Sequence, residues 1–165
     1  MENSLSNTVS QRVEIIPFET QYRSHFESLN NEWLEQQFYI EDYDREVLQN
    51  PEDHILKPGG QILFARVDDK IVGVVALIVR SADTYELSKM GVTAKSQGLK
   101  IGQKLMDAAI EYSKQAGIKR IMLDSNRKLA PAIRLYHKVG FKEIAVPEDT
   151  PYERCDIRME LLLSD

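Results

Sequence analysis

The sequence predicts an α/β fold in which helices pack on a mixed β-sheet. The middle of the chain contains apolar strand-like segments joined by a hairpin-type turn. The second half then alternates helix-like and strand-like segments, an order typical of a mixed sheet covered by helices. A length of 165 residues favours one domain. We therefore expect a single domain over residues 1–165, with a flexible tail over residues 1–10.

The N-terminal third is expected to supply one strand and two helices. Val13 and Ile15 predict a first strand that Pro17 ends, and Thr20 offers the N-cap of a helix. The apolar face of that helix consists of Tyr22, Phe26, Leu29 and Trp33. The polar stretch that follows is expected to form only a short helix, around residues 43–49.

Three strands are expected next. The segments 61–67 and 71–80 flank Asp68-Asp69-Lys70, which is a hairpin signal. The third strand covers residues 84–92. Simple alternation places Glu86, Ser88, Met90 and Val92 on one of its faces, and Tyr85, Leu87, Lys89 and Gly91 on the other.

The second half of the chain is expected to alternate helices and strands. A helical stripe consists of Ile101, Leu105, Ala108, Ala109, Tyr112 and Ala116. Gly117 is typical of the residue that ends such a helix. A buried strand over residues 120–124 follows, and Pro131 suits the first turn of another helix that stops at Gly140. Two further strands close the chain, at residues 141–146 and 155–163.

The turn between the third strand and its helix is the most informative segment for function. A helix start presents backbone N–H groups without intrahelical partners at the positive end of the helix dipole, and such groups bind phosphate oxygens. Gly98 permits an unusual backbone angle, Gly102 permits a close approach of the helix, and Lys100 adds a cation. Gln97 can add a side-chain donor. The alternative is an ordinary connection whose glycines merely make the turn.

Composition limits the class of protein. A net charge of −5 argues against a nucleic-acid partner, whose electrostatic footprint is usually basic, and permits a cationic substrate. The longest apolar run, residues 71–79, is too short to cross a bilayer, so no membrane partner is expected. Cys155 is the single cysteine and no export signal is visible, so a cytoplasmic location is expected. The three histidines share no ligand spacing, and no metal is expected.

Two segments together resemble the GCN5-related N-acetyltransferase (GNAT) superfamily. The segment 97–102 is similar to its pyrophosphate motif, Gln/Arg-x-x-Gly-x-Gly/Ala, with Lys100 where glycine is commonest. Residues 131–141 resemble its second hallmark, in which Leu-Tyr precedes Gly-Phe. The chain looks like a bacterial, small-molecule-type member. This resemblance implies the GNAT acyl-CoA N-acyltransferase fold, with six to seven strands in a twisted mixed sheet and about four helices.

The resemblance implies acetyl-CoA as co-substrate, in a cleft where the strand ending at Val92 splays from the strand 120–124. Backbone groups of Met90 and Val92 would bind the pantetheine arm. The amides of the turn would bind the pyrophosphate; these belong to Gln97, Gly98, Leu99, Lys100, Ile101 and Gly102. Asn126 would reach the pantetheine or the acyl end.

The resemblance also suggests catalytic residues. A backbone N–H, that of Val92, would polarise the thioester carbonyl. Tyr136 would protonate the departing thiolate; the alternative is that its ring only packs on the sheet. Glu86 would serve as general base; the alternatives are a solvated glutamate or the salt-bridge partner of an arginine, and members of the family also work without a base.

Five polar or aromatic side chains have less defined roles. Glu41 and Asp44 could hold an ammonium group, but a solvated acidic stretch is the commoner explanation for such residues. Tyr39, Tyr152 and Arg154 could line the same mouth. Arg154 would favour an acceptor that carries a carboxylate.

The resulting hypothesis is an N-acetyltransferase that moves the acetyl group of acetyl-CoA to a primary amine of a small molecule or amino-acid-like acceptor, by direct attack in a ternary complex. One alternative is a protein N-terminal or lysine acetyltransferase. Another is a CoA-binding regulatory module without turnover. Members of the superfamily often form dimers through edge strands or helices, so a homodimer is an alternative to a monomer.

Overall fold

The computed structural model describes residues 12–96 and 98–163 and contains a seven-stranded mixed sheet with strand order β1-β2-β3-β4-β5-β7-β6. The predicted fold class is confirmed. The strands are β1 (Val13–Pro17), β2 (Gln61–Val67), β3 (Lys70–Ser81), β4 (Thr84–Val92), β5 (Arg120–Ser125), β6 (Lys142–Ile144) and β7 (Ile157–Leu162). The predicted flexible tail lies outside the described residues.

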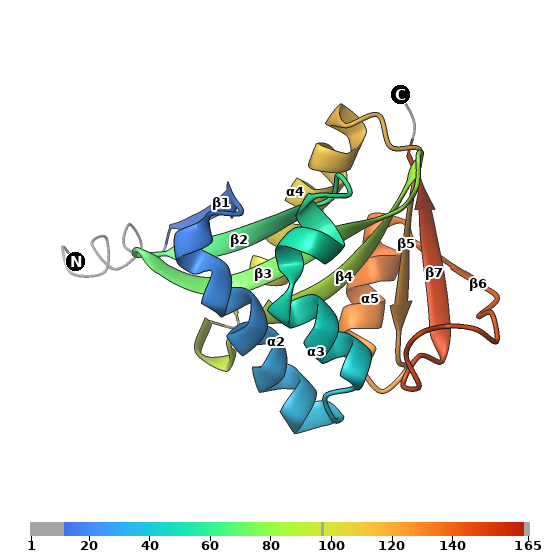
Figure 1. Cartoon of the computed structure of the whole chain (residues 1–165), viewed down its shortest axis with the longest axis horizontal. Helices are drawn as coiled ribbons and strands as arrows, with labels where there is room; N and C mark the ends of the chain where they lie inside the picture. Colours follow the sequence, from blue (N-terminus) through green and yellow to red (C-terminus); the bar gives the residue numbers. More distant parts are fainter. Residues whose placement is uncertain (1–11, 97, 164–165) are drawn as a thin grey trace.

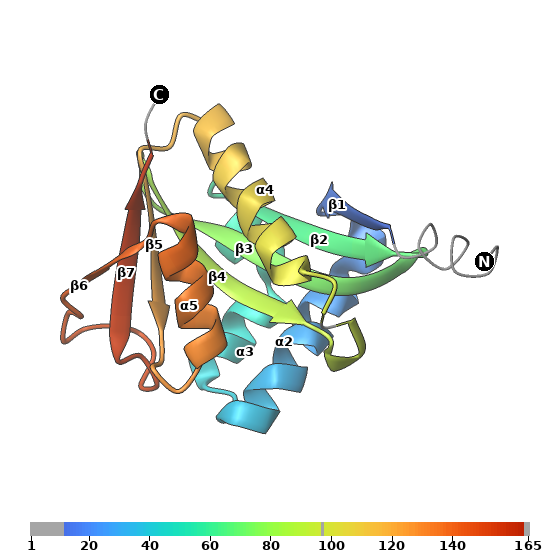
Figure 2. The same ribbon diagram turned by 180° about the vertical axis from the view of Figure 1, so that it is seen from behind.

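Four α-helices cover the two faces of the sheet. They are α2 (Arg23–Gln37), α3 (Asp42–Gln49), α4 (Ile101–Gln115) and α5 (Ala130–Val139). Helices α2 and α3 lie on one face (Figure 1), and α4 and α5 lie on the other (Figure 2). Each face has its own apolar core. Phe26 of α2 and Phe64 of β2 belong to one core, and Leu105 of α4 and Ile121 of β5 belong to the other. Within the described residues, no helix is both long and apolar enough to span a membrane.

The hairpin predicted at Asp68-Asp69 joins β2 to β3, and both aspartates have positive φ values, 49° and 67°, as tight hairpin turns require. The last two strands are shorter than predicted. Strand β6 ends at Ile144 and β7 begins at Ile157, so the residues between them form a loop.

Strands β4 and β5 separate soon after they meet. They pair in parallel over three positions only, the last of which joins Glu86 to Met122. Beyond this point β4 continues to Val92 and β5 to Ser125 without pairing (Figure 2). The separation therefore opens the middle of the sheet at the position that the family resemblance implied.

A β-bulge interrupts β4 on its β3 side. One residue of β3, Val75, stands opposite two residues of β4, Lys89 and Met90, where the register shifts. Lys89 has a φ of 55°, in the left-handed region. A bulge of this kind inserts one residue and reverses the faces that the following side chains occupy.

The bulge makes the predicted alternation along β4 wrong. Met90 and Val92 were expected to share a face with Glu86, but they pack against the core beneath α4 and α5. Lys89 instead turns toward α3, where its ammonium meets Asp44. Sequence periodicity extends through a strand only while the pairing register is unbroken.

The bulge also brings the end of β4 close to α2. A Cβ atom added to Gly91 would lie 3.0 Å from the carbonyl oxygen of Leu29 and 3.1 Å from Cδ1 of Trp33. Both distances are shorter than ordinary van der Waals contact. The absence of a side chain at position 91 therefore lets α2 rest directly on the strand.

We predict that Gly91→Ala lowers the free energy of unfolding by about 1–3 kcal/mol, because overpacking against backbone forces α2 away from β4. Gly102→Ala is the control: a Cβ there would meet only Leu135 Cδ2 at 3.8 Å. That change should raise the free energy of unfolding by up to about 1 kcal/mol, through helix propensity. Urea denaturation measures both, and equal effects would contradict the close contact.

Candidate active site

The separated strands form the wall of a cleft with a volume of about 400 Å³. Its lining comes from the end of α2, from β4, from the end of β5 and from α5. The lining includes Trp33, Phe38, Leu87, Ser88, Met90, Val92, Asp124, Asn126, Pro131, Tyr136, Tyr152, Arg154 and Cys155. This cleft brings Met90, Val92, Asn126 and Tyr136 together, as predicted from the sequence. Glu86 is not part of its lining.

The backbone of Val92 faces the cleft. The next residue, Thr93, donates its N–H to the carbonyl of Val72 at 2.9 Å. In an antiparallel pair, hydrogen-bonded and non-hydrogen-bonded positions alternate, so Val92 opposite Gly73 is a non-hydrogen-bonded position. Its N–H and carbonyl groups therefore turn away from β3, toward the side that β5 has left.

The start of α4 presents backbone N–H groups that precede the helix ladder. Gly98 and Lys100 have positive φ values, 98° and 57°. The first intrahelical bond runs from Lys104 N–H to the Lys100 carbonyl at 3.0 Å, so the N–H groups of Ile101 and Gly102 precede the helix ladder. Gln97, predicted to add a side-chain donor, lies outside the described residues.

Two observations concern the glycines of this turn. No protein atom lies within 4 Å of a Cβ added at Gly98, and one added at Gly102 makes only ordinary contact with Leu135. Packing therefore does not require a glycine at position 102, although glycine there costs a helix about 1 kcal/mol. Ile101 is buried and anchors the turn against Gly73, where a Cβ would lie 2.9 Å from Ile101 Cγ2.

Tyr136 projects from α5 into the cleft wall. It is 8% exposed, and its ring centroid lies 5.9 Å from that of Phe141. Burial raises the pKa of Tyr136 to about 12. Its hydroxyl therefore stays protonated at neutral pH and can act as a donor.

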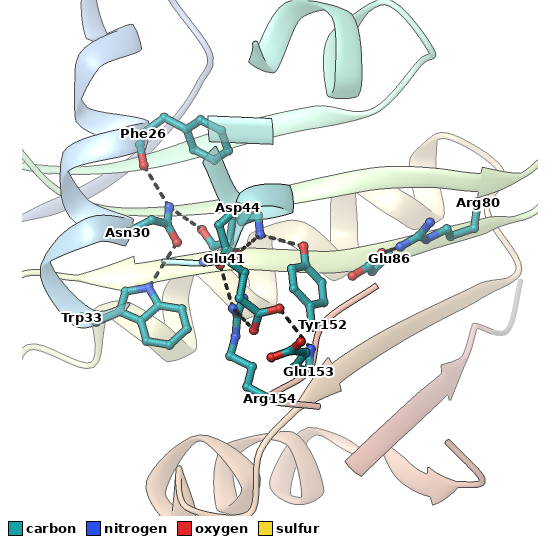
Figure 3. Close-up of polar contacts among 11 residues, drawn as sticks. Phe26, Asn30, Trp33, Glu41, Asp44, Arg80, Glu86, Tyr152, Glu153 and Arg154 are labelled. Atoms are coloured by element: carbon teal, nitrogen blue, oxygen red, sulfur yellow. Dashed lines mark hydrogen bonds and ion pairs between the residues drawn. The ribbon is translucent and has the colours of Figure 1, made fainter. Parts of the chain in front are cut away.

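Glu86 lies in the sheet beside the cleft and is 1% exposed. Its carboxylate accepts a hydrogen bond from Nη2 of Arg80 (Figure 3). Burial raises the pKa of Glu86, while the Arg80 guanidinium opposes that rise. Of the alternatives for this residue, the solvated glutamate is wrong. The pairing with an arginine is present.

Asn126 forms part of the cleft wall through its own hydrogen bonds. Its Nδ2 donates to the Arg154 carbonyl at 2.7 Å, and its Oδ1 accepts the Lys128 N–H at 2.8 Å. These bonds join the β5–α5 connection to the segment before β7. Lys128 then crosses the mouth of the cleft: its ammonium donates to the Gln37 carbonyl and lies 4.8 Å from the Phe38 ring centroid.

Four charged side chains form a buried network beside the cleft. Asp44 accepts two hydrogen bonds from Arg154, both 2.7 Å, and one from Lys89 Nζ at 2.8 Å. Arg154 also donates to Glu41 at 3.0 Å (Figure 3). Asp44 is fully buried and Glu41 is 9% exposed, so the expectation of a solvated acidic stretch is wrong.

The two carboxylates are buried because each has several hydrogen-bond partners. They also form a capping box at the start of α3, in which the Glu41 N–H donates to Asp44 at 2.9 Å. Burial alone would raise the pKa of Asp44, but the Arg154 guanidinium and the Lys89 ammonium hold that pKa below its ordinary value. The two carboxylates and the two cations of the network balance in charge, which leaves little net attraction for the ammonium group of a substrate.

Tyr152 and Tyr39 have different positions around this network. Tyr152 is buried, and its hydroxyl accepts a hydrogen bond from Lys89 Nζ at 2.6 Å. Tyr39 is 56% exposed and donates to Glu153. Of the two tyrosines expected at the mouth, only Tyr152 lines the cleft.

Lys89 and Asn30 are residues that sequence reasoning missed. Asn30 is fully buried, and its Nδ2 donates to the Lys89 carbonyl at 3.1 Å (Figure 3 shows Asn30 between α2 and the strand). Its Oδ1 accepts a hydrogen bond from Trp33 Nε1 at 3.1 Å. One signal was available: Asn30 falls within the apolar helical stripe of α2, four residues after Phe26. In the described residues, no cluster of side chains has a metal-binding arrangement.

Comparisons with known proteins show the family of this chain. The sequence model of the acetyltransferase (GNAT) family matches residues 25–141, which is most of the chain. The chain belongs to the GNAT family of acetyltransferases. A crystal structure of a GNAT-family acetyltransferase from Staphylococcus aureus Mu50 is similar, with a TM-score of 0.83 and 28% identity. That comparison covers 93% of this chain and all of the other.

Two further proteins are similar over different lengths. An uncharacterized N-acetyltransferase of Schizosaccharomyces pombe is 35% identical over 97 residues, which are 58% of this chain and 60% of that protein. The chain thus spans less than two thirds of that curated relative. The spermidine N-acetyltransferase of Vibrio cholerae, solved with CoA and spermine, has a TM-score of 0.69 at 21% identity. The alignment covers 91% of this GNAT chain and 95% of the spermidine N-acetyltransferase.

We predict that Asp44→Asn lowers the free energy of unfolding of this GNAT protein by about 3–5 kcal/mol at pH 7, because it leaves buried cations without their carboxylate. The depressed pKa of Asp44 means that its stabilisation is complete above the unfolded value, about 3.9, and is lost as pH falls through the folded value. The gap between wild type and variant should therefore shrink below about pH 4.

The control for this variant is Asp42→Asn. Asp42 is fully exposed and paired only with Arg45, at 2.9 Å, so its loss should change the free energy of unfolding by less than about 0.5 kcal/mol. Urea denaturation at pH 7 and pH 3 measures both variants. Equal losses would show that the network contributes no more than a surface ion pair.

Proposed function

We propose that this chain is an N-acetyltransferase that transfers the acetyl group of acetyl-CoA to a primary amine of a small molecule or amino-acid-like acceptor. The observation that carries the proposal is the pairing of two features. One is the cleft between β4 and β5, and the other is the free helix start at Lys100 to Gly102 beside it. The spermidine N-acetyltransferase neighbour, solved with CoA, supports a CoA ligand in this fold.

The residues present fit the CoA part of the co-substrate. Backbone N–H groups at the start of α4 would bind the pyrophosphate, and Lys100 would add a positive charge. Gly102 supports this assignment because no packing contact requires a glycine there. Met90 and Val92 would hold the pantetheine arm through the strand edge that β5 leaves open.

The chain would promote transfer mainly by orientation. Holding an amine against a thioester in the correct geometry contributes up to about 7–11 kcal/mol relative to free encounter. The co-substrate supplies an acetyl thioester, whose C–S bond breaks as the new C–N bond forms. The Val92 N–H, which points to the cleft side, would polarise the carbonyl oxygen during this step.

Tyr136 is the candidate acid for the thiolate. Its pKa of about 12 lies above the ordinary thiol value of about 8.5, a gap worth about 5 kcal/mol against proton transfer. Burial in the same cleft raises the pKa of the thiol as well and narrows that gap. Its place in the cleft wall makes Tyr136 the donor that we assign.

Glu86 is the candidate base for the amine. Burial raises its pKa, which brings the carboxylate nearer to the range in which it accepts a proton at neutral pH. The ammonium proton of the acceptor would pass to Glu86, and the neutral nitrogen would then attack the carbonyl carbon. In the structure the Arg80 guanidinium donates a hydrogen bond to this carboxylate. Glu86 can therefore accept the amine proton only if that hydrogen bond loosens during the reaction.

The test of the function is titration calorimetry with acetyl-CoA, followed by a screen of amines, amino acids and peptides in which free thiol is measured. We expect binding, and thiol release with small amines. Release only with peptides would favour a protein acceptor, and binding without release would favour a regulatory module. No binding at millimolar concentration would refute all three.

We predict that Tyr136→Phe lowers kcat by about 100-fold, because it removes the proton donor to the thiolate, and leaves the Kd for acetyl-CoA unchanged. The matched control is Tyr112→Phe on α4, outside the cleft lining, which should leave both constants unchanged. Steady-state kinetics and calorimetry measure them. An unaffected kcat in Tyr136→Phe would show that the phenol only packs on the sheet.

We predict that Glu86→Gln lowers kcat/KM by about 100-fold at neutral pH. Only the carboxylate accepts the amine proton, so wild-type kcat/KM should decline as pH falls through the raised pKa of Glu86. The variant should lack that decline. Glu52→Gln, which breaks a 2.7 Å pair with Arg23 away from the cleft, is the control. Identical pH profiles in wild type and Glu86→Gln would exclude Glu86 as the base.

A further inference from the structure

A second pocket, with a volume of about 280 Å³, is lined by β3, β5, β7 and the loop before β7, and shares no lining residue with the cleft. We call it the arginine pocket. It is lined by Arg80, Arg120, Met122, Pro147, Asp149, Thr150, Pro151 and Arg158. Three strands, β3, β5 and β7, each supply one guanidinium group, and the loop between β6 and β7 supplies the opposite wall.

The partners of these arginines do not line the pocket. Arg158 donates to Asp124 through Nε at 2.6 Å and Nη2 at 2.9 Å. Arg120 donates to Glu160 through Nε at 2.7 Å, and Arg80 donates to Glu86. Among the described residues, the lining contains three guanidinium groups and a single carboxylate, Asp149. The carboxylates behind the lining hold the three cations in place and neutralise them, so the pocket offers an anion guanidinium N–H donors rather than a surplus of positive charge.

Each guanidinium retains capacity to bind an anion. An arginine has five N–H groups, and in the described part of the chain these carboxylates take one from Arg80, one from Arg120 and two from Arg158. The side chains of Arg80 and Arg120 are 35% and 33% exposed, so neither is fully buried by its ion pair. Arginine presents these groups in the fork geometry that carboxylate and phosphate oxygens match.

The arginine pocket is connected to the reaction cleft through two buried carboxylates. Asp124 lines the cleft, binds Arg158 and accepts a hydrogen bond from Thr150 at 3.3 Å. Glu86, the candidate base, binds Arg80. Each of these ion pairs therefore links an arginine of the pocket to a carboxylate that lies in or beside the cleft.

Arg154 does not provide the same chemistry. It was expected to favour an acceptor with a carboxylate, but its guanidinium donates to both Asp44 and Glu41 and its side chain is only 13% exposed. In the described part of the chain, guanidinium N–H groups that no carboxylate occupies lie in the arginine pocket instead.

We propose that the arginine pocket binds an anionic group of the acceptor, so that the substrate is an amine that also carries a carboxylate or phosphate. This inference rests on the proposed function. An acceptor anion at Arg80 competes with Glu86 for the same guanidinium. Binding of the correct acceptor thus loosens the contact that holds Glu86, and frees its carboxylate for the amine proton.

The experiment compares matched amines with and without a carboxylate, namely ornithine with putrescine and lysine with cadaverine, in which the side-chain amine lies several bonds from the carboxylate. In any pair that the wild type acetylates, kcat/KM should be about 10- to 100-fold higher for the amine with the carboxylate than for the amine without it. Arg120→Gln should abolish this preference and leave the Kd for acetyl-CoA unchanged. Arg120 is chosen because its partner Glu160 is partly exposed, so the change leaves no fully buried charge.

The control is Arg23→Gln. Arg23 makes an Nε bond of the same length, 2.7 Å, to Glu52 at a similar exposure, but lies outside the arginine pocket. It should retain the preference. As a readout independent of turnover, inorganic phosphate should raise the Tm of wild type and of Arg23→Gln more than that of Arg120→Gln.

The outcomes separate this inference from the proposed function. Acetylation of simple amines without any carboxylate preference, or a preference that survives Arg120→Gln, overturns the inference and leaves the acetyltransferase intact. Absence of acetyl-CoA binding refutes both. An equal effect of phosphate on the Tm of the three proteins also overturns the anion-binding role.

Discussion

The geometry of the site depends on the bulge at Lys89 and on the buried groups that hold it. Asn30 binds the Lys89 carbonyl from α2, and Asp44 and Tyr152 bind its ammonium from α3 and the β6–β7 loop. A lysine with a φ of 55° is strained by roughly 1–2 kcal/mol, so these contacts offset a local cost. In return, Met90 and Val92 lie on the α4 and α5 side of the sheet and line the cleft.

Much of the fold was predictable because local patterns determine it. Asp68-Asp69 predicted the hairpin, and the turn after Val92 and the helix stop at Gly140 were visible as local signals. The bulge was not, because periodicity carries no sign of a register shift. Its partners Asn30 and Asp44 are 59 and 45 residues away from Lys89 in sequence, so only the folded chain brings them together.

The candidate site was predictable to a different degree on its two sides. The proposed cofactor side consists largely of backbone, and motif spacing made Lys100, Gly102 and Tyr136 its candidates. The acceptor side consists of charged side chains whose meaning depends on their partners. Asp44 looks like a surface acid in sequence but is neutralised in a buried network, whereas Arg80 gives no local signal and pairs with the candidate base.

The departure of Lys100 from the family motif has a physical explanation in this structure. The position has a φ of 57°, which glycine adopts without strain and which explains why glycine is commonest there. A lysine at the same angle costs stability in the free protein, but its charge lies at a helix start that favours anions. The strain is present with or without a ligand, whereas the attraction exists only when phosphate is bound. If the turn binds the pyrophosphate as proposed, lysine at position 100 exchanges stability of the empty turn for affinity toward a polyanion, an exchange expected at a binding site rather than at a structural turn.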